Sequence, residues 1–240
     1  MSQTPKGNDV TVSTLRSLRV RGVLERLHAR ARVEDPIAKE RVATRERELG
    51  ERLSVPARYE LYGDAPLAIT TETGELYYVL AVAQRAHRIV EFGSSHGIST
   101  IYLAAALRDT GSVGVLVTTE ILSAKAAATE RNLTEAGLSD LVEVRTGDAR
   151  DTLTQLAAPV DMLVLDGRND LYVTIFDLIS PRLAPTGVVI ADLGRDDPDL
   201  EAYQRHVRHA RAGFHSVTLP VDAGIELTVP IGRSNAGTGV

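Results

Sequence analysis

From residue 88 onward, short apolar runs alternate with stretches that have helical periodicity. Buried strands that alternate with helices predict an α/β fold, a doubly wound and mostly parallel seven-stranded sheet, with a C-terminal antiparallel strand pair. Gly137 is expected to close one of the helices, and Pro181 to disturb the last turn of another. The expected strands are 89–92, 113–119, 141–145, 160–165, 187–191, 214–219 and 225–229, and the expected helices are 99–107, 122–136, 150–157, 172–183 and 199–212.

The first third of the chain has the spacing of helices. Apolar residues from Val12 to Leu27 recur at intervals of three and four, which predicts an amphipathic helix that ends before Asp35-Pro36. A second helix is expected over 37–53 and a third over 73–85, with breakers at Pro56 and at 63–66 between them. We therefore divide the chain into an N-terminal helical extension (1–66), a main α/β domain (67–232) and a disordered tail (233–240).

Composition excludes several classes of protein. Hydrophobic residues make up 43% of the 240, which is typical of a globular chain and not of a disordered one. The absence of cysteine excludes disulfides, thiolate metal sites and a cysteine nucleophile. The sequence has neither an apolar run of membrane-spanning length nor a signal-peptide pattern, so we expect a cytoplasmic protein with no membrane partner.

The charge is unevenly distributed. Residues 1–60 contain 13 Lys and Arg against 9 Asp and Glu, so this segment is basic within a chain of net charge −5. The acidic remainder argues against binding to a nucleic-acid backbone. We expect the basic helices to pack on an acidic surface, of this subunit or of another, and we predict a homodimer.

A glycine turn follows the first expected strand. Gly93 and Gly97 are separated by three residues, so the turn does not match the dinucleotide-binding fingerprint. With Glu91 before it, the turn has the pattern of class I methyltransferases, which bind S-adenosylmethionine. We expect Gly93 to let the backbone leave the strand, and Gly97 to leave room for a ligand against the main chain. The alternative is a plain strand-to-helix turn.

Acidic residues stand at the ends of the next four strands. They are Glu120, Asp148, Asp166 and Asp192, and ligands of doubly wound sheets bind at these carboxyl ends. Glu120 could accept hydrogen bonds from ribose hydroxyls, and Asp148 could reach an adenine amino group or simply cap a helix. Asp166 and Asp192 could hold a divalent cation, act as a general base and its helper, or be unrelated strand ends.

Seven blocks of the span 67–232 resemble the catechol and caffeoyl-CoA O-methyltransferase family of class I methyltransferases. The blocks are 70–74, 90–100, 119–121, 132–140 with 147–149, 160–166 with Tyr172, 187–192 and 222–228. The resemblance implies a Rossmann-like methyltransferase domain, S-adenosylmethionine as cofactor, and methyl transfer to a hydroxyl oxygen of a phenol- or enol-like small molecule. The cofactor-binding residues are then expected to be Glu91, Gly93, Ser94, Ser95, Gly97, Ser99, Glu120, Ile121, Asp148, Ala149 and Asp166.

Two departures from the family concern the catalytic centre. Metal-dependent members have a third, asparagine ligand where this chain has Leu193, and a lysine base where it has Asn169. Asp166 and Asp192 remain as catalytic residues and metal ligands, but two carboxylates make a weak Mg²⁺ site, so a metal-free reaction is favoured. His96 is a further candidate for the base, with packing against the cofactor as the alternative.

The acceptor cannot be named from these residues. The segments 30–66 and 193–198 are expected to shape its pocket, but they contain no recognisable motif. The alternatives are a metal-independent enzyme acting on a non-catechol oxygen, nitrogen or carbon, and a non-catalytic cofactor-binding scaffold.

Overall fold

A single seven-stranded sheet forms the centre of the molecule. The computed structural model describes residues 13–111, 113–193, 198–209 and 213–231. The sheet order is β3-β2-β1-β4-β5-β7-β6; the first five strands in chain order run parallel, and β7 lies antiparallel to both β5 and β6. The doubly wound fold expected from the sequence is therefore confirmed. The strands are β1 (Arg88–Phe92), β2 (Val115–Glu120), β3 (Val142–Thr146), β4 (Val160–Leu165), β5 (Leu183–Asp192), β6 (Phe214–Leu219) and β7 (Ile225–Pro230).

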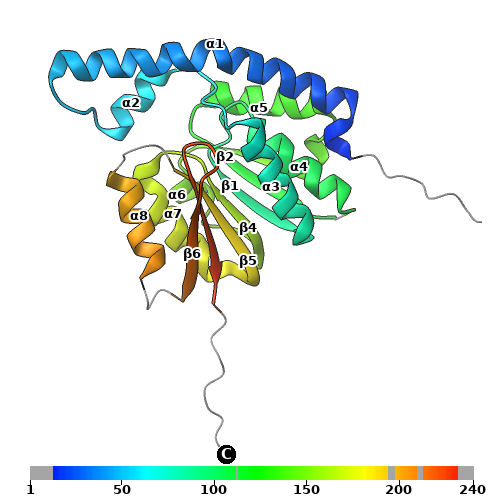
Figure 1. Ribbon diagram of the computed structural model, residues 1–240. Helices are drawn as coiled ribbons and strands as arrows, with labels where there is room; N and C mark the ends of the chain where they lie inside the picture. The colour runs from blue at the N-terminus through cyan, green and yellow to red at the C-terminus, as the bar shows by residue number, and fades with distance from the viewer. Residues whose placement is uncertain (1–12, 112, 194–197, 210–212, 232–240) are drawn as a thin grey trace, which may run out of the picture.

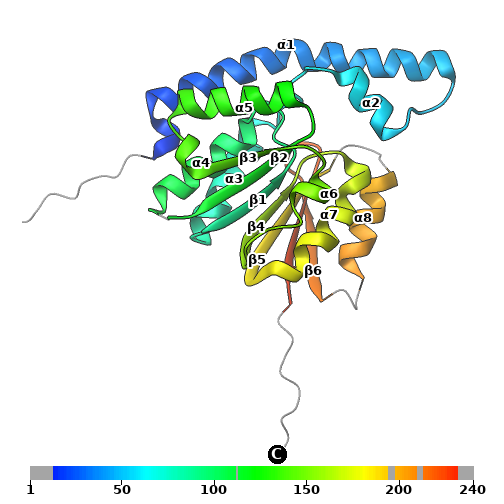
Figure 2. The same cartoon turned by 180° about the vertical axis from the view of Figure 1, so that it is seen from behind.

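Helices cover both faces of the sheet (Figures 1 and 2). One face carries α3 to α5 and the other carries α6 to α8, and each face packs over its own hydrophobic cluster. The long α1 lies across the end at which the parallel strands finish, with α2 folded back beneath it (Figure 1). The helices are α1 (Leu18–Leu49), α2 (Val55–Tyr62), α3 (Thr71–Ala83), α4 (Ile98–Asp109), α5 (Ser123–Ala136), α6 (Ala149–Thr152), α7 (Tyr172–Ile179) and α8 (Pro198–Arg208).

The expected break at Asp35-Pro36 is wrong, because α1 runs through Pro36 without interruption. A proline inside a helix costs about 3 kcal/mol, so tertiary contacts must hold this turn. The buried Asp35 carboxylate accepts hydrogen bonds from the backbone N–H groups of Leu67 (2.8 Å) and Ala68 (2.9 Å). Pro36 itself is exposed, and so is Arg32, the residue whose carbonyl loses its helix donor.

Other boundaries differ because local signals were misjudged. Helix α2 was not expected, because Pro56 was interpreted as a helix breaker. Pro56 instead occupies the first turn of α2, where a residue needs no backbone N–H donor. The helix expected at 150–157 is only the single turn α6, and β5 begins at Leu183 rather than at 187. Gly137 does close α5 in the left-handed conformation, and Pro181 does end α7 in a 3₁₀ turn, as predicted.

The N-terminal segment is packed on the α/β body. Val20, Val23 and Leu27 of α1 belong to the same buried cluster as Tyr77 of α3 and Ile101 of α4. The division at residue 66 stays a prediction, and the tail 233–240 lies outside the described residues. No helix of the described residues is long and apolar enough to span a bilayer.

Replacing Asp35 tests the anchor of α1. Asp35→Ala leaves two buried backbone donors without a partner, so the free energy of unfolding should fall by about 2–4 kcal/mol. Pro36→Ala is the control, because it restores a helix donor one residue away and should leave stability unchanged or raise it. Chemical denaturation of both variants measures the difference. An Asp35→Ala protein as stable as Pro36→Ala would show that the carboxylate does not anchor the helix.

Candidate functional site

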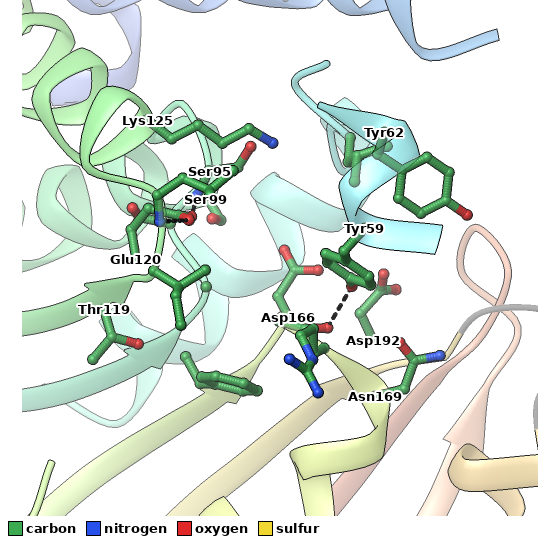
Figure 3. Close-up of a pocket in the computed structure, with 18 of the residues that line it drawn as sticks. Tyr59, Tyr62, Ser95, Ser99, Thr119, Glu120, Lys125, Asp166, Asn169 and Asp192 are labelled. Carbon is green, nitrogen blue, oxygen red and sulfur yellow. Dashed lines mark hydrogen bonds between the residues drawn. The ribbon is translucent and has the colours of Figure 1, made fainter. Parts of the chain in front are cut away.

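A cavity of about 900 Å³ lies at the carboxyl ends of the strands, under α1 and α2. Its volume falls within the range of small-molecule sites, and in doubly wound folds such sites occur at this edge. Figure 3 shows two ends of the cavity: Ser95, Ser99, Glu120 and Lys125 on one side, and Tyr59, Asp166 and Asp192 on the other. The site residues expected from the sequence that line it are Gly93, Ser94, Ser95, His96, Ser99, Glu120, Ile121, Asp148, Ala149, Asp166 and Asp192.

The glycines of the turn serve the packing of the backbone. Gly93 has φ +97°, and a Cβ there would lie 2.7 Å from the Asp166 carbonyl oxygen, so only glycine lets β1 leave the sheet beside β4. Gly97 has φ +85°, and a Cβ there would lie 3.0 Å from Thr129 Cγ2. Glycine at position 97 thus allows close packing against Thr129, and Gly97 is not among the residues that line the cavity. Its contact with a cofactor stays a prediction.

Glu91 lies behind the cavity wall and not on it. It is fully buried, and one carboxylate oxygen accepts hydrogen bonds from Thr100 Oγ1 (2.6 Å) and Thr118 Oγ1 (2.5 Å). Its other oxygen has no partner among the described residues, and burial raises the pKa of this carboxyl. Direct contact of Glu91 with a cofactor therefore stays a prediction. What the structure shows is that Glu91 accepts hydrogen bonds from a residue of α4 and a residue of β2.

Glu120 ends β2 and points into the cavity. Its two oxygens accept one backbone N–H each, from Ser95 and from Leu122, both at 2.9 Å. A carboxylate oxygen can accept more than one hydrogen bond, so Glu120 can also accept from a hydroxyl in the cavity. Next to Glu120, the apolar side chain of Ile121 is 55% exposed, so an apolar surface lies beside a hydrogen-bond acceptor.

Asp148 acts as the cap of α6, which was the plainer of the two expectations. Its carboxylate accepts a hydrogen bond from Arg150 N at 2.9 Å and pairs with the Arg150 guanidinium. That pairing lowers the pKa of Asp148. Asp148 and Ala149 also line the cavity, so a role toward adenine stays a prediction.

His96 is tied into the structure through both ring nitrogens. Nε2 lies 2.9 Å from the Asp64 carbonyl oxygen, and Nδ1 lies 3.3 Å from Arg30 Nη1. The side chain is buried, and burial lowers the pKa of this histidine. The role of base stays a prediction. Because both ring nitrogens have hydrogen-bonding partners, His96 is better suited to holding these segments in place.

Asp166 and Asp192 face each other at the other end of the cavity. They follow or end the neighbouring strands β4 and β5, which pair through Leu165 and Ala191. Burial, then the Asp192 charge, raises the pKa of Asp166 well above its usual value. Burial and the Asp222 charge raise the pKa of Asp192 to about 6, while the Lys39 ammonium opposes them. One proton on this pair at neutral pH relieves the repulsion.

Several lining residues were not found from the sequence, among them Lys39, Tyr59, Tyr62 and Asp222. Lys39 comes from α1, Tyr59 and Tyr62 come from α2, and Asp222 comes from the turn between β6 and β7. Tyr59 donates a hydrogen bond to the Gly167 carbonyl oxygen at 2.8 Å, and burial raises the pKa of its phenol. Lys39, Tyr59 and Tyr62 belong to the segment 30–66, which was expected to shape the acceptor pocket. No sequence motif identifies these three residues.

Two carboxylates alone make a weak donor set for a divalent metal. Within the described residues no three His, Cys, Asp or Glu side chains converge closely enough to hold an ion. Leu193 is buried on the cavity wall at the position expected for a third ligand, and it offers no donor. Asp166 and Asp192 alone leave most of the oxygen ligands that Mg²⁺ requires to water.

Comparison with known proteins agrees with the geometry. Residues 90–192 match the family model described as a methyltransferase domain. Relatives are a catechol O-methyltransferase of Niastella koreensis, 33% identical over 54% of this chain, and one of Mycobacterium tuberculosis, 38% identical over 52%. The matches span 59% and 55% of those two proteins. A putative O-methyltransferase of Mycobacterium sp. (strain KMS) is 31% identical over 70% of this chain and 80% of its own length.

Solved structures share the architecture. The O-methyltransferase of Bacillus cereus in complex with S-adenosylhomocysteine superposes with a TM-score of 0.63 at 25% identity, over 73% of this chain and 88% of that one. TomG of Streptomyces achromogenes, in complex with S-adenosylmethionine, gives 0.62 at 25% identity over 81% and 90%. With the fold, the cavity and these relatives together, the chain belongs to the class I O-methyltransferase family that includes the catechol and caffeoyl-CoA enzymes.

Proposed function

We propose that this protein transfers a methyl group from S-adenosylmethionine to a hydroxyl oxygen of a small phenol- or enol-like molecule. The observation that carries the proposal is one cavity with two chemically different ends: acceptors for a ribose at Glu120, and a buried carboxylate pair at Asp166 and Asp192. Relatives named catechol O-methyltransferase, and similar structures that hold the cofactor or its product, support the same reaction.

The cofactor fits the end near β1 and β2. The two oxygens of Glu120 suit two ribose hydroxyls, and the exposed Ile121 suits one face of adenine. Gly93, Ser94, Ser95 and Ser99 line the path toward Asp166 and offer backbone and hydroxyl groups to the amino-acid end. When bound, S-adenosylmethionine supplies an electrophilic methyl group on a positively charged sulfur.

The carboxylate pair accounts for proton transfer without a metal. A base works best when its pKa lies near the operating pH, and the pKa of Asp192 is raised to about 6. In this assignment Asp192 would take the acceptor's hydroxyl proton, and Asp166, whose pKa is raised well above its usual value, would hold a proton beside it. Tyr59 and Tyr62 roof this end, which keeps the acceptor in line and excludes water.

We also propose that the assembly is a homodimer formed along α1, with no nucleic-acid partner and a cytoplasmic location. Val33 and Ile37 lie one turn apart on α1 and are 62% and 58% exposed, an apolar strip that a second copy would cover.

Removing the Glu120 charge tests the cofactor end. Glu120→Gln should weaken S-adenosylmethionine binding by about 1.5–3 kcal/mol, because charge-assisted bonds to two hydroxyls are lost. Glu130→Gln, an exposed change on α5, is the matched control and should bind normally. Titration calorimetry measures both, and equal affinities would remove Glu120 from the site.

The pH dependence tests the base. Activity requires ionised Asp192, so kcat/KM should fall as pH drops through about 6, with the raised pKa setting that limb. Asp192→Asn should lower kcat by about a hundredfold or more. The same change should stabilise the fold increasingly as pH rises from about 4 to about 6, and by a constant amount above that, because folding raises the pKa of this acid above its unfolded value. An acid limb below pH 5 would contradict this assignment.

Chelation tests the metal-free reaction. Activity should be unchanged in excess EDTA, because Asp166 and Asp192 have no third ligand beside them in the described part of the chain. Complete loss in EDTA, restored by stoichiometric magnesium, would show that a metal does take part.

Light scattering at micromolar concentration tests the assembly. The expected mass is twice 25.9 kDa. Val33→Glu with Ile37→Glu should give the monomer without loss of the fold, since both side chains are exposed. A monomeric wild-type protein would refute the dimer.

A further inference from the structure

A buried lysine lies at the cofactor end of the cavity, and the proposed chemistry does not use it. Lys125 lines the cavity, yet it is only 6% exposed, and burial lowers the pKa of its ammonium group. It also lies in the first turn of α5, where the helix dipole disfavours a positive charge. A cation in a position that is unfavourable on both counts indicates that the charge itself has a use.

The hydrogen bond of Lys125 does not require that charge. Nζ donates to the Ala65 carbonyl oxygen at 2.8 Å, and a neutral donor would satisfy this oxygen as well. A bond to one carbonyl does not offset the cost of taking an ammonium out of water. The charge must therefore act on a nearby anion.

Glu120 is the anion that acts most strongly on Lys125, and it too is buried. Burial raises the pKa of the Glu120 carboxyl, whereas the Leu122 N–H and then the Lys125 charge lower it. Figure 3 places both side chains on the same side of the cavity. Each charge thus favours the ionised form of the other.

The two side chains are also linked through the backbone between α2 and α3. Ser95 donates from its backbone N–H to Glu120 at 2.9 Å and from its hydroxyl to the Pro66 carbonyl oxygen at 2.6 Å. Lys125 holds the preceding carbonyl, that of Ala65. A change at Lys125 therefore reaches Glu120 both through charge and through this short stretch of backbone.

We propose that Lys125 is a positioning residue for the cofactor, which keeps the Glu120 carboxylate ionised and holds the Ala65 backbone beside it. The proposal rests on the proposed function, in which Glu120 binds the ribose, and it adds the residue on which that binding depends. A protonated carboxyl has a donor where an acceptor is needed, so hydroxyl binding weakens when Glu120 takes up a proton. Lys125 thus extends cofactor binding to lower pH.

Three substitutions separate the charge from the hydrogen bond. Lys125→Arg keeps both, Lys125→Gln keeps a donor but removes the charge, and Lys125→Met removes both. Arg131→Gln, an exposed change on α5 outside the cavity lining, is the matched control for loss of one positive charge. Glu120→Gln removes the group that titrates, and its combination with Lys125→Gln completes a double-mutant cycle.

The measurement is the affinity for S-adenosylhomocysteine, by titration calorimetry from about pH 5.5 to about pH 8.5, on either side of neutrality. Without the lysine charge the pKa of Glu120 rises further, so its carboxylate is lost at a higher pH. The dissociation constant of Lys125→Gln relative to wild type should therefore grow as pH falls, by up to about tenfold for each unit of that rise. Lys125→Met should show the same trend, so the test does not depend on one uncharged variant.

The variants that keep the charge, and the control, should behave differently. Lys125→Arg should follow the pH dependence of the wild type, apart from a constant factor for its larger side chain. Arg131→Gln should bind as the wild type does at every pH. In turnover at neutral pH, Lys125→Gln should raise KM for S-adenosylmethionine far more than it changes kcat.

Other charged groups surround the pair, and the double-mutant cycle separates their titration from that of Glu120. In the Glu120→Gln background, Lys125→Gln should change the affinity by a factor that does not vary with pH. The surrounding groups are Arg30 and Asp35 on α1, Asp64 after α2, His96 on the turn before α4, and Glu91 on β1.

A ratio of dissociation constants that is the same at every pH would overturn the proposal and leave Lys125 with a structural role only. A pH-dependent ratio that persists in the Glu120→Gln background would overturn it as well. Failure of the wild type to bind S-adenosylhomocysteine at any pH would instead reject the proposed function.

Discussion

The cavity depends on how the segment 64–68 is held in place. This segment follows α2, which covers the cavity, and it contacts the turn between β1 and α4. Asp35 of α1 holds the backbone N–H groups of Leu67 and Ala68, and Ser95 donates to the Pro66 carbonyl oxygen at 2.6 Å. Lys125 of α5 donates to the Ala65 carbonyl oxygen at 2.8 Å. Side chains from three separate elements thus fix one short strip of backbone. These bonds add to the packing of Val20, Val23 and Leu27 on the body and help to hold α1 and α2 over the cavity that Lys39, Tyr59 and Tyr62 line.

The same attachment explains why charged groups are buried here at all. Lys125 is buried, and burial lowers its pKa, although the Glu120 and Asp64 carboxylates oppose that shift. Glu120 is buried too, and burial raises its pKa. Each group is costly alone, but each has hydrogen-bonding partners around the strip. The acceptor end is different, because burial and neighbouring carboxylates raise the pKa of both Asp166 and Asp192 there.

The sequence predicts the sheet and the cofactor end better than it predicts the roof. Buried parallel strands have unmistakable apolar runs, and the acids that stop those runs are forced to one edge of the sheet, so Glu120, Asp166 and Asp192 could be located in advance. The continuity of α1 could not, because Pro36 signals a break, and only a tertiary bond from Asp35 to a segment some 30 residues away overrides it. Tyr59 and Lys39 belong to helices whose hydrophobic pattern does not indicate which part of the molecule each helix covers. The packing of Gly97 against Thr129 could not be predicted for a related reason, since Thr129 lies on a different helix.

Loss of the third metal ligand and loss of the lysine base are physically linked changes. In a metal site the ion lowers the pKa of the substrate hydroxyl, so deprotonation depends less on a nearby base. The two aspartates must remain ionised there to hold the ion. Once Leu193 removes a ligand, the aspartates lose the charge that kept them ionised, and burial raises the pKa of Asp192 to about 6. A carboxylate with that pKa is itself a suitable base, so a lysine at position 169 is no longer required. The absence of a third ligand and the absence of the lysine are therefore compatible when they occur together, because the proposed base, Asp192, needs neither the ion nor the lysine.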